Sequence, residues 1–137
     1  MGRFSVEVEL ANNDDLALQR AGTLRADQVR RARLRGVVDS GAARLVIPEP
    51  VALQLGLRTV GQTNVRYADL RRAQRDIAGD IELTYAGRRG VFNAIVEPAR
   101  DSALIGAIVM EELDLIVDCT NQRLEPRDPK QIISEIE

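Results

Sequence analysis

Apolar and polar residues alternate along much of the chain, in the pattern typical of β-strands that turn one face to a core. The first alternating segment is residues 4–10, and a longer one covers residues 29–38. Further strand-like segments follow at residues 44–47, 63–68, 73–85, 91–97 and 115–117. Several short strands at such close spacing predict an all-β barrel or sandwich.

Turn and helix signals lie between these strands. Residues 12–15, Asn-Asn-Asp-Asp, predict a turn or loop, and their oxygen ligands lack the alternate spacing of an EF-hand calcium loop. Residues 16–28 are ambiguous, because Gly22 and Thr23 interrupt any helix. A short helix or helical turn is expected at residues 48–57, which have prolines in the first turn and a glycine near the end.

Two hairpin turns are expected in the second half of the chain. Residues 69–72 separate two strand-like segments, and residues 86–90 precede a third. The first hairpin is long and polar at its tip, so we expect it to project and to move. A helix-compatible segment at residues 107–113 then follows Gly106.

Composition limits both the core and the chemistry. The 137 residues fit a single domain, which we place at residues 1–125, followed by a polar C-terminal tail at residues 126–137. Hydrophobic residues make up 45% of the chain and aromatic residues 3%, so the core must be aliphatic. The chain has no histidine, which excludes Ser-His-Asp and Cys-His catalysis within one chain and His-ligated zinc sites.

The cysteine content and the first residues bear on the compartment. The single cysteine, Cys119, permits no intrachain disulfide, and we interpret it as a structural thiol. The start, MGRFSVEVEL, has neither the basic region nor the long apolar region of a signal peptide. No apolar run approaches the length that spans a bilayer. We therefore expect a cytoplasmic protein that does not bind membranes.

The charge gives little reason to expect a nucleic-acid partner. The formal net charge is −2, although a local basic cluster occurs within residues 29–38. Because no aromatic residues are interleaved for base stacking, we favour a solvated strand face over a binding surface. The alternative is a β-domain that binds RNA through Arg30, Arg31, Arg33 and Arg35, together with Arg71, Arg72 and Arg75.

One stretch joins an apolar strand to a carboxylate and a turn. Val37 and Val38 are expected to form a buried strand with Asp39 at its end. An unpaired carboxylate is costly in an apolar setting, and the Ser40-Gly41 turn offers a hydroxyl and free backbone N–H groups as donors. The turn is therefore predicted to hold Asp39 in place.

This stretch and three later segments resemble the retropepsin-like aspartic proteases (clan AA), the single-domain relatives of the retroviral proteases, and in particular their small bacterial members. Residues 37–42 match the hydrophobic-hydrophobic-Asp-Ser/Thr-Gly-Ala signature. The other matching segments are residues 45–48 with 53–57 behind them, residues 67–69 at the flap position, and residues 104–106 with 112–118 as the second glycine motif. Asp-Ser-Gly alone is a weak signal, but these segments are separate requirements and together make a strong match.

The resemblance implies a closed all-β barrel of the acid-protease type, with one short C-terminal helix, that forms a symmetric homodimer. It implies an aspartic endopeptidase that acts on an extended peptide or protein, with no metal, cofactor or nucleic acid. Asp39 would be the catalytic residue. The residues implied to support the active-site loop are Ser40, Gly41, Ala42 and Gly106, and those implied to form the flap over the substrate are Tyr67, Ala68, Asp69 and Leu70.

The number of catalytic motifs determines the assembly. Aspartic proteolysis needs two facing carboxyl groups that share a proton, one acting as a base on water and the other as an acid. This chain has one Asp-Ser/Thr-Gly motif, since neither Asp114 nor Asp118 begins a second. An active site therefore requires Asp39 from each of two identical subunits. Because the shared proton must be retained, we expect activity to be favoured below neutral pH.

Three positions depart from the family's pattern. Ala43 stands where many relatives carry a polar residue, Ala107-Ile108 replaces the Arg-Asn or Arg-Asp of retroviral members, and Leu70 replaces a glycine common in bacterial relatives. The dimer therefore cannot use the salt bridges of the retroviral members. A second hypothesis is a catalytically silent domain of the same fold that binds peptides or mediates dimerisation. The intact Asp-Ser-Gly motif argues against it.

Overall fold

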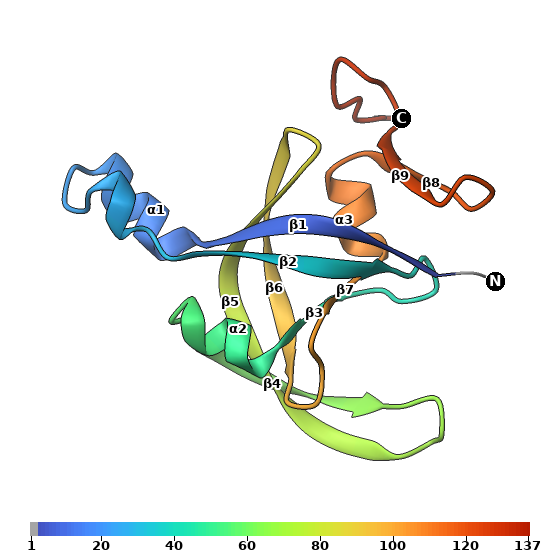
Figure 1. The fold of residues 1–137 in the computed structure, drawn as a ribbon, viewed down its shortest axis with the longest axis horizontal. Helices are drawn as coiled ribbons and strands as arrows, with labels where there is room; N and C mark the ends of the chain where they lie inside the picture. Colours follow the sequence, from blue (N-terminus) through green and yellow to red (C-terminus); the bar gives the residue numbers. More distant parts are fainter. Residues whose placement is uncertain (1–2) are drawn as a thin grey trace.

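The structure is a computed structural model and describes residues 3–137. Its strands are β1 (Phe4–Asn12), β2 (Arg31–Val38), β3 (Leu45–Pro48), β4 (Thr59–Arg66), β5 (Arg72–Tyr85), β6 (Arg88–Glu97), β7 (Ala103–Ile105), β8 (Leu115–Asp118) and β9 (Arg123–Pro126). Its helices are α1 (Asn13–Arg20), α2 (Glu49–Gln54) and α3 (Ala107–Glu112), and a 3-10 turn covers Ala26–Gln28 (Figure 1).

The main sheet closes on itself. Strands β1, β2, β7, β3, β6 and β5 are hydrogen-bonded in that order, and β1 also pairs with β5. This last pairing joins the two ends of the sheet, which removes its free edges and makes a barrel. Strand β4 pairs with β5 outside the closed part, and the hairpin of β4 and the first half of β5 projects from the barrel (Figure 1). The predicted closed β-barrel is confirmed.

The interior of the barrel is aliphatic, as the composition predicts. The largest fully buried side chains are Leu10, Leu45, Ile47, Leu55, Ile81, Leu83, Ile105, Leu113 and Val109. Among residues 3–137, Phe92 is the one buried aromatic residue. Strand β2 shows the alternation most clearly, with Ala32, Gly36 and Val38 buried and Arg31, Arg33 and Arg35 exposed, because successive side chains point to opposite faces of a strand. The helix α2 adds Leu55 from its C-terminal end, and α3 adds Val109.

Some local predictions are wrong. Residues 12–15 are not a loop: Asn12 is the N-cap of α1, and its side chain accepts a hydrogen bond from the backbone N–H of Asp15 at 3.0 Å. Both acidic residues then lie in the first turn, where the helix dipole favours them. The second hairpin turn is also tighter than residues 86–90, because β6 begins at Arg88 and only Ala86 and Gly87 remain in the turn.

The basic face of β2 is neutralised by its neighbours. Arg31, Arg33 and Arg35 are exposed, in agreement with a solvated strand face. The antiparallel register with β1 places Glu9 opposite Arg33, and their charged atoms are 3.3 Å apart. Arg31 also lies within 3.5 Å of Glu9. These cross-strand ion pairs leave little free positive charge for RNA.

Asp15 in helix α1 forms an ion pair with Arg30, the residue before β2. The buried carboxylate of Asp15 accepts hydrogen bonds from the Arg30 backbone N–H at 3.0 Å and from its Nε and Nη2 at 2.9 Å. The side-chain hydrogen bond from Arg30 outweighs desolvation and lowers the pKa of Asp15 below its ordinary value of 3.8. The ionised form of Asp15 therefore stabilises the folded state.

We expect Asp15→Asn to lower the free energy of unfolding by about 2 kcal/mol at neutral pH, because the Arg30 donors lose their charged acceptor. Since the pKa of Asp15 is lowered on folding, this contribution is present above about pH 4 and is lost as the pH falls through the folded-state pKa. Urea unfolding of both proteins at about pH 7 and pH 3 measures this difference. A difference that stays constant over this range contradicts the role given to the ion pair.

The C-terminal segment is fastened to the barrel by one buried arginine. The side chain of Arg88, at the start of β6, donates to the carbonyl oxygens of Leu113 and Asp114 at 3.0 Å. It also donates to the carbonyls of Asp128 and Gln131, so the polar tail is tied to the end of α3. Strands β8 and β9 form a separate two-stranded sheet beside this contact (Figure 1). Within residues 3–137, every helix is too short or too polar to cross a membrane.

Candidate active site

Asp39 follows the last residue of β2, where the strand leaves the barrel. Its backbone N–H donates to the carbonyl of Ile105 on β7 at 3.1 Å, which continues the parallel pairing of β2 and β7. Its carbonyl accepts from the N–H of Ala42 at 3.1 Å and closes a turn over residues 39–42. The backbone around Asp39 is therefore fixed on both sides.

The carboxylate of Asp39 is oriented by the turn, as the sequence predicts. Its Oδ1 accepts a hydrogen bond from the Gly41 N–H at 3.0 Å. Its Oδ2 lies 3.5 Å from the guanidinium of Arg3, whose side chain is 67% exposed. The Asp39 side chain is itself 22% exposed and faces a hollow of about 160 Å³. A held but accessible carboxylate can act on a ligand at this surface.

Cys119 lies at the same hollow. Together with Val117 it forms the side contributed by the end of β8. The thiol is exposed. The interpretation of Cys119 as a structural thiol is therefore wrong, because a thiol that packs in a core would be buried.

Gly106 packs closely against the backbone of the loop that follows Asp39. A Cβ at this position would lie 2.5 Å from the Arg44 carbonyl oxygen and 2.8 Å from that of Ala42, so only glycine fits. The next two residues donate their N–H groups to the loop, Ala107 to Ala42 at 2.8 Å and Ile108 to Ala43 at 2.9 Å. The start of α3 is therefore hydrogen-bonded to the loop that follows Asp39. The structure thus brings Asp39, Ser40, Gly41, Ala42 and Gly106 together, with Ser40 exposed at the surface.

The hairpin of β4 and β5 has the form expected of a flap. Its tip is a turn in which the Tyr67 N–H donates to the Arg71 carbonyl and the Leu70 N–H donates to the Tyr67 carbonyl, both at 2.9 Å. Leu70 has a φ of 69°, a left-handed conformation that favours glycine. Ala68, Asp69 and Leu70 are exposed at the tip.

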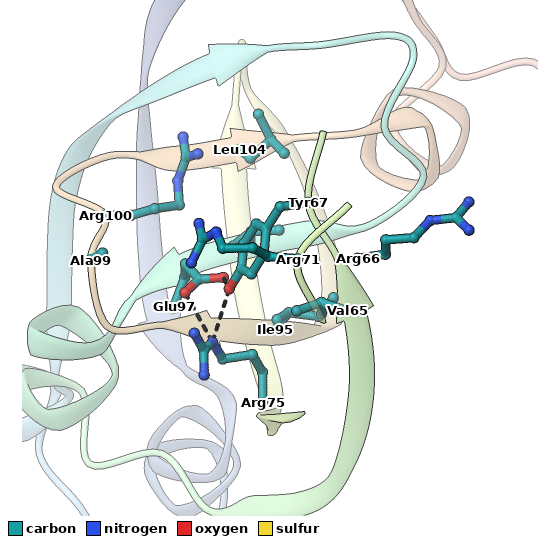
Figure 2. Close-up of a pocket in the computed structure, with 11 residues that line it drawn as sticks. Val65, Arg66, Tyr67, Arg71, Arg75, Ile95, Glu97, Ala99, Arg100 and Leu104 are labelled. Carbon is teal, nitrogen blue, oxygen red and sulfur yellow. Dashed lines mark hydrogen bonds and ion pairs between the residues drawn. The ribbon is translucent and has the colours of Figure 1, made fainter. Parts of the chain in front are cut away.

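A pocket of about 370 Å³ lies between the flap and the barrel. The flap contributes Tyr67, Arg71 and Arg75, and the barrel contributes Val46, Ile95, Glu97, Arg100 and Leu104 (Figure 2). Leu104 is paired with Val37 on β2, two residues before Asp39, and with Val46 on β3. The pocket and the Asp39 loop therefore share the same strands.

Tyr67, Arg75 and Glu97 form a hydrogen-bonded cluster in this pocket. The Tyr67 hydroxyl donates to Glu97 Oε2 at 2.7 Å, and Arg75 Nε donates to Glu97 Oε1 at 3.0 Å (Figure 2). Burial and then the hydrogen bond to Glu97 raise the pKa of Tyr67, so the hydroxyl keeps its proton. The cluster holds both strands of the flap to the end of β6.

Of the residues that line this pocket, the sequence alone singles out Tyr67 as a flap residue and Arg71 and Arg75 as basic candidates for RNA, and it does not single out Glu97 or Arg100. Glu97 is a carboxylate, only 8% exposed, at the end of the apolar segment 91–97, and that unusual context was the available signal. Arg100 gives no signal in the sequence, because arginines are common on exposed loops. Within residues 3–137, no group of three or more His, Cys, Asp or Glu side chains is arranged as metal ligands.

Solved structures share this fold. The EIAV protease complexed with the inhibitor HBY-793 superposes with a TM-score of 0.58 at 15% sequence identity, over 82% of this chain and 88% of that chain. The simian foamy virus (mac) protease superposes with a TM-score of 0.50 at 18% identity, over 78% of this chain and 91% of that chain. The sequence matches no family model and no curated protein. The chain therefore has the retropepsin-like fold of the retroviral aspartic proteases.

Proposed function

We propose that two copies of this chain form an aspartic endopeptidase in which each copy supplies its Asp39 to a shared pair of carboxyl groups. The observation that carries the proposal is the placement of Asp39. Its carboxylate is held by the Gly41 N–H at 3.0 Å and is accessible, in a loop fixed by Gly106, within the fold of the retroviral proteases. The partner is a second copy, and the substrate is a peptide or protein.

The two aspartates of the C-terminal part of the chain, Asp114 and Asp118, are already bound by other groups and are poor partners for Asp39. Asp114 accepts from Arg127 Nε at 2.7 Å and from the Ile133 N–H at 3.1 Å, and these contacts lower its pKa. Asp118 accepts from both the side chain and the backbone of Asn121, which lowers its pKa as well. Each of these groups is engaged and stays ionised, so neither suits the sharing of a proton with Asp39.

The surroundings of Asp39 leave room for the second carboxyl group. The contact with Arg3 is an exposed ion pair with a separation of 3.5 Å, and such pairs contribute little to stability. A second copy that approaches across a two-fold axis can displace it. Ser40 and Gly41 of the same loop line the hollow and would be brought close to their counterparts.

The chemistry then follows from one proton shared by two carboxyl groups. The ionised carboxyl removes a proton from water while the oxygen of that water bonds to the peptide carbonyl carbon. The protonated carboxyl gives its proton to the carbonyl oxygen, which produces a tetrahedral diol. Transfer of a proton to the peptide nitrogen allows the C–N bond to break and releases an amine and a carboxylic acid. No metal or cofactor takes part in these steps.

The flap supports binding of an extended peptide. Residues 67–71 form the tip of the flap, and the pocket of about 370 Å³ beneath it offers space for substrate side chains. An extended peptide laid between flap and barrel can hydrogen-bond through its main chain as an added strand does. Closure of the flap would exclude water other than the attacking molecule.

The proposal is tested by incubating the full chain with a mixed peptide pool and identifying the products by mass spectrometry. We expect internal peptide bonds to be cleaved, and cleavage at about pH 5 to be faster than at about pH 8, because the pair must retain one proton. A rate that is flat or rises to alkaline pH contradicts the shared proton. Absence of cleavage by a chain that is dimeric in solution supports instead a catalytically silent peptide-binding domain.

A further inference from the structure

The pocket between the flap and the barrel is basic, although the chain has a formal net charge of −2. It is lined by the four arginines Arg66, Arg71, Arg75 and Arg100 and by a single carboxylate, that of Glu97. The low-dielectric walls of a cleft concentrate the electric field, so such an excess of charge acts strongly on a bound ligand. The partners of each arginine determine how much of this charge a ligand meets.

Arg75 and Arg71 are paired with carboxylates. Arg75 Nε lies 3.0 Å from Glu97 Oε1, which makes that pair neutral overall. Arg71 Nε lies 2.8 Å from Asp69 Oδ2 at the exposed flap tip, and its guanidinium stacks over the Tyr67 ring at 4.8 Å from the ring centre. Water screens this exposed ion pair, so Arg71 keeps part of its attraction for a second anion.

Arg100 is bound to neutral groups. Its Nε donates to the Ser102 carbonyl at 2.9 Å, and its Nη2 lies 3.2 Å from the Ser102 hydroxyl. These oxygens orient the guanidinium but carry no net charge, so within residues 3–137 they leave its positive charge uncompensated. Its remaining N–H groups can donate to a ligand, since a guanidinium has five donors.

The apolar walls of the pocket complete the binding site. In the view of Figure 2, Arg71 and Arg100 lie on the same side of Glu97, whereas the Arg66 side chain points away from the pocket. Val46, Ile95 and Leu104 form an apolar surface beside them. A side chain with methylene groups and a terminal carboxylate matches this combination.

We propose that this pocket selects substrates with an acidic side chain, above all glutamate, whose carboxylate is bound by Arg100 with Arg71 as a second donor. Its methylene groups would pack on Val46, Ile95 and Leu104. The inference rests on the proposed function, since it takes the pocket to be part of the substrate cleft. Charge-assisted hydrogen bonds from arginine to carboxylate are roughly twice as strong as neutral ones, so we expect a preference for glutamate over glutamine of about tenfold.

Binding can be measured separately from cleavage in the full-length Asp39→Asn chain. The probes are fluorescent octapeptides of alanine, leucine and phenylalanine that carry one glutamate, glutamine or lysine at each position in turn. Fluorescence anisotropy gives the dissociation constant of each peptide. We expect glutamate at one position to bind about tenfold more tightly than glutamine there, lysine to bind most weakly, and the preference to shrink as salt is added.

Three substitutions in the same background locate the preference. Arg100→Gln should reduce it to about threefold or less, because the uncompensated charge is lost. Arg100→Lys keeps the charge and should retain most of the preference, which separates charge from any change in the loop of residues 98–102. Arg89→Gln removes an exposed charge from the opposite end of β6, outside the pocket, and should leave the preference unchanged.

The outcomes distinguish this inference from the proposed function. Equal binding of glutamate and glutamine peptides, or binding of neither, overturns the acidic preference, whatever the natural chain cleaves. A preference that survives Arg100→Gln overturns the assignment to this pocket. A preference that is lost in Arg100→Gln and kept in Arg100→Lys supports the inference even where the natural chain cleaves nothing, in which case the protease proposal alone fails.

Discussion

Asp39→Asn is expected to lower the rate of peptide cleavage by about 10³-fold or more, with little change in the fold. Asparagine keeps the size of the side chain and can still accept the Gly41 N–H through its amide oxygen, but it can neither remove a proton from water nor donate a shared one. Cleavage rates of the natural chain and the variant measure the effect, and thermal unfolding of both is the control. A variant with near-natural activity would contradict the role of Asp39.

Mixing the two chains tests whether one active site uses two copies of Asp39. If natural and variant chains associate at random and mixed dimers are inactive, an equal amount of variant should reduce the activity of a fixed amount of natural chain to about one half. A tenfold excess should reduce it to about one tenth. Activity that does not respond to added variant would show that each chain works alone. Arg89→Gln chains added in the same amounts are the control for dilution and association.

The second large effect is expected at Gly106. Gly106→Ala should lower the free energy of unfolding by about 3 kcal/mol, because the new Cβ would lie 2.5 Å from the Arg44 carbonyl oxygen and 2.8 Å from that of Ala42. These are backbone atoms, so the clash can be relieved only by moving the active-site loop or the start of α3. Urea unfolding measures the loss of stability, and any folded fraction should cleave peptides more slowly.

The matched control is Gly61→Ala in β4. A Cβ at Gly61 meets nothing within 4 Å, and the residue is exposed in an edge strand. Alanine there should leave stability unchanged or raise it by up to about 1 kcal/mol, because the unfolded chain loses conformational freedom. Equal effects of the two substitutions would mean that the close approach at Gly106 does not constrain the loop.

The sequence predicts the barrel because several of its strands bury alternate aliphatic residues. This alternation is visible within a few consecutive residues of the sequence. It predicts the Asp39 loop because a carboxylate after an apolar strand requires local donors, and the Ser-Gly turn is adjacent in the chain. The sequence does not predict helix α1, because Gly22 and Thr23 interrupt the segment that follows it and because the N-cap residue Asn12 and the acidic first turn also suit a loop. The helix is short, and its capping residues resemble those of a turn.

The flap pocket could not be predicted, because its residues come together only through tertiary packing. Tyr67 and Glu97 are 30 positions apart in the chain, and Arg100 belongs to a loop with no regular pattern. The alternation of apolar and polar residues does not assign Glu97 to either face of β6, because Glu97 is the last residue of the strand and is followed by Pro98. Pairings of this kind depend on which strands become neighbours, and that information is distributed over the whole barrel.

Because β4 lies outside the closed barrel, movement of the flap is separated from the stability of the barrel. Strand β5 serves both parts: its second half pairs with β1 and β6, its first half with β4, and an irregularity between Ala78 and Ile81 divides them. Lifting the flap therefore breaks the Tyr67 and Arg75 contacts with Glu97 but leaves every strand pairing that closes the barrel intact. On the proposed function, sequence changes in residues 59–76 would therefore alter substrate entry and specificity at little cost to the stability of the barrel.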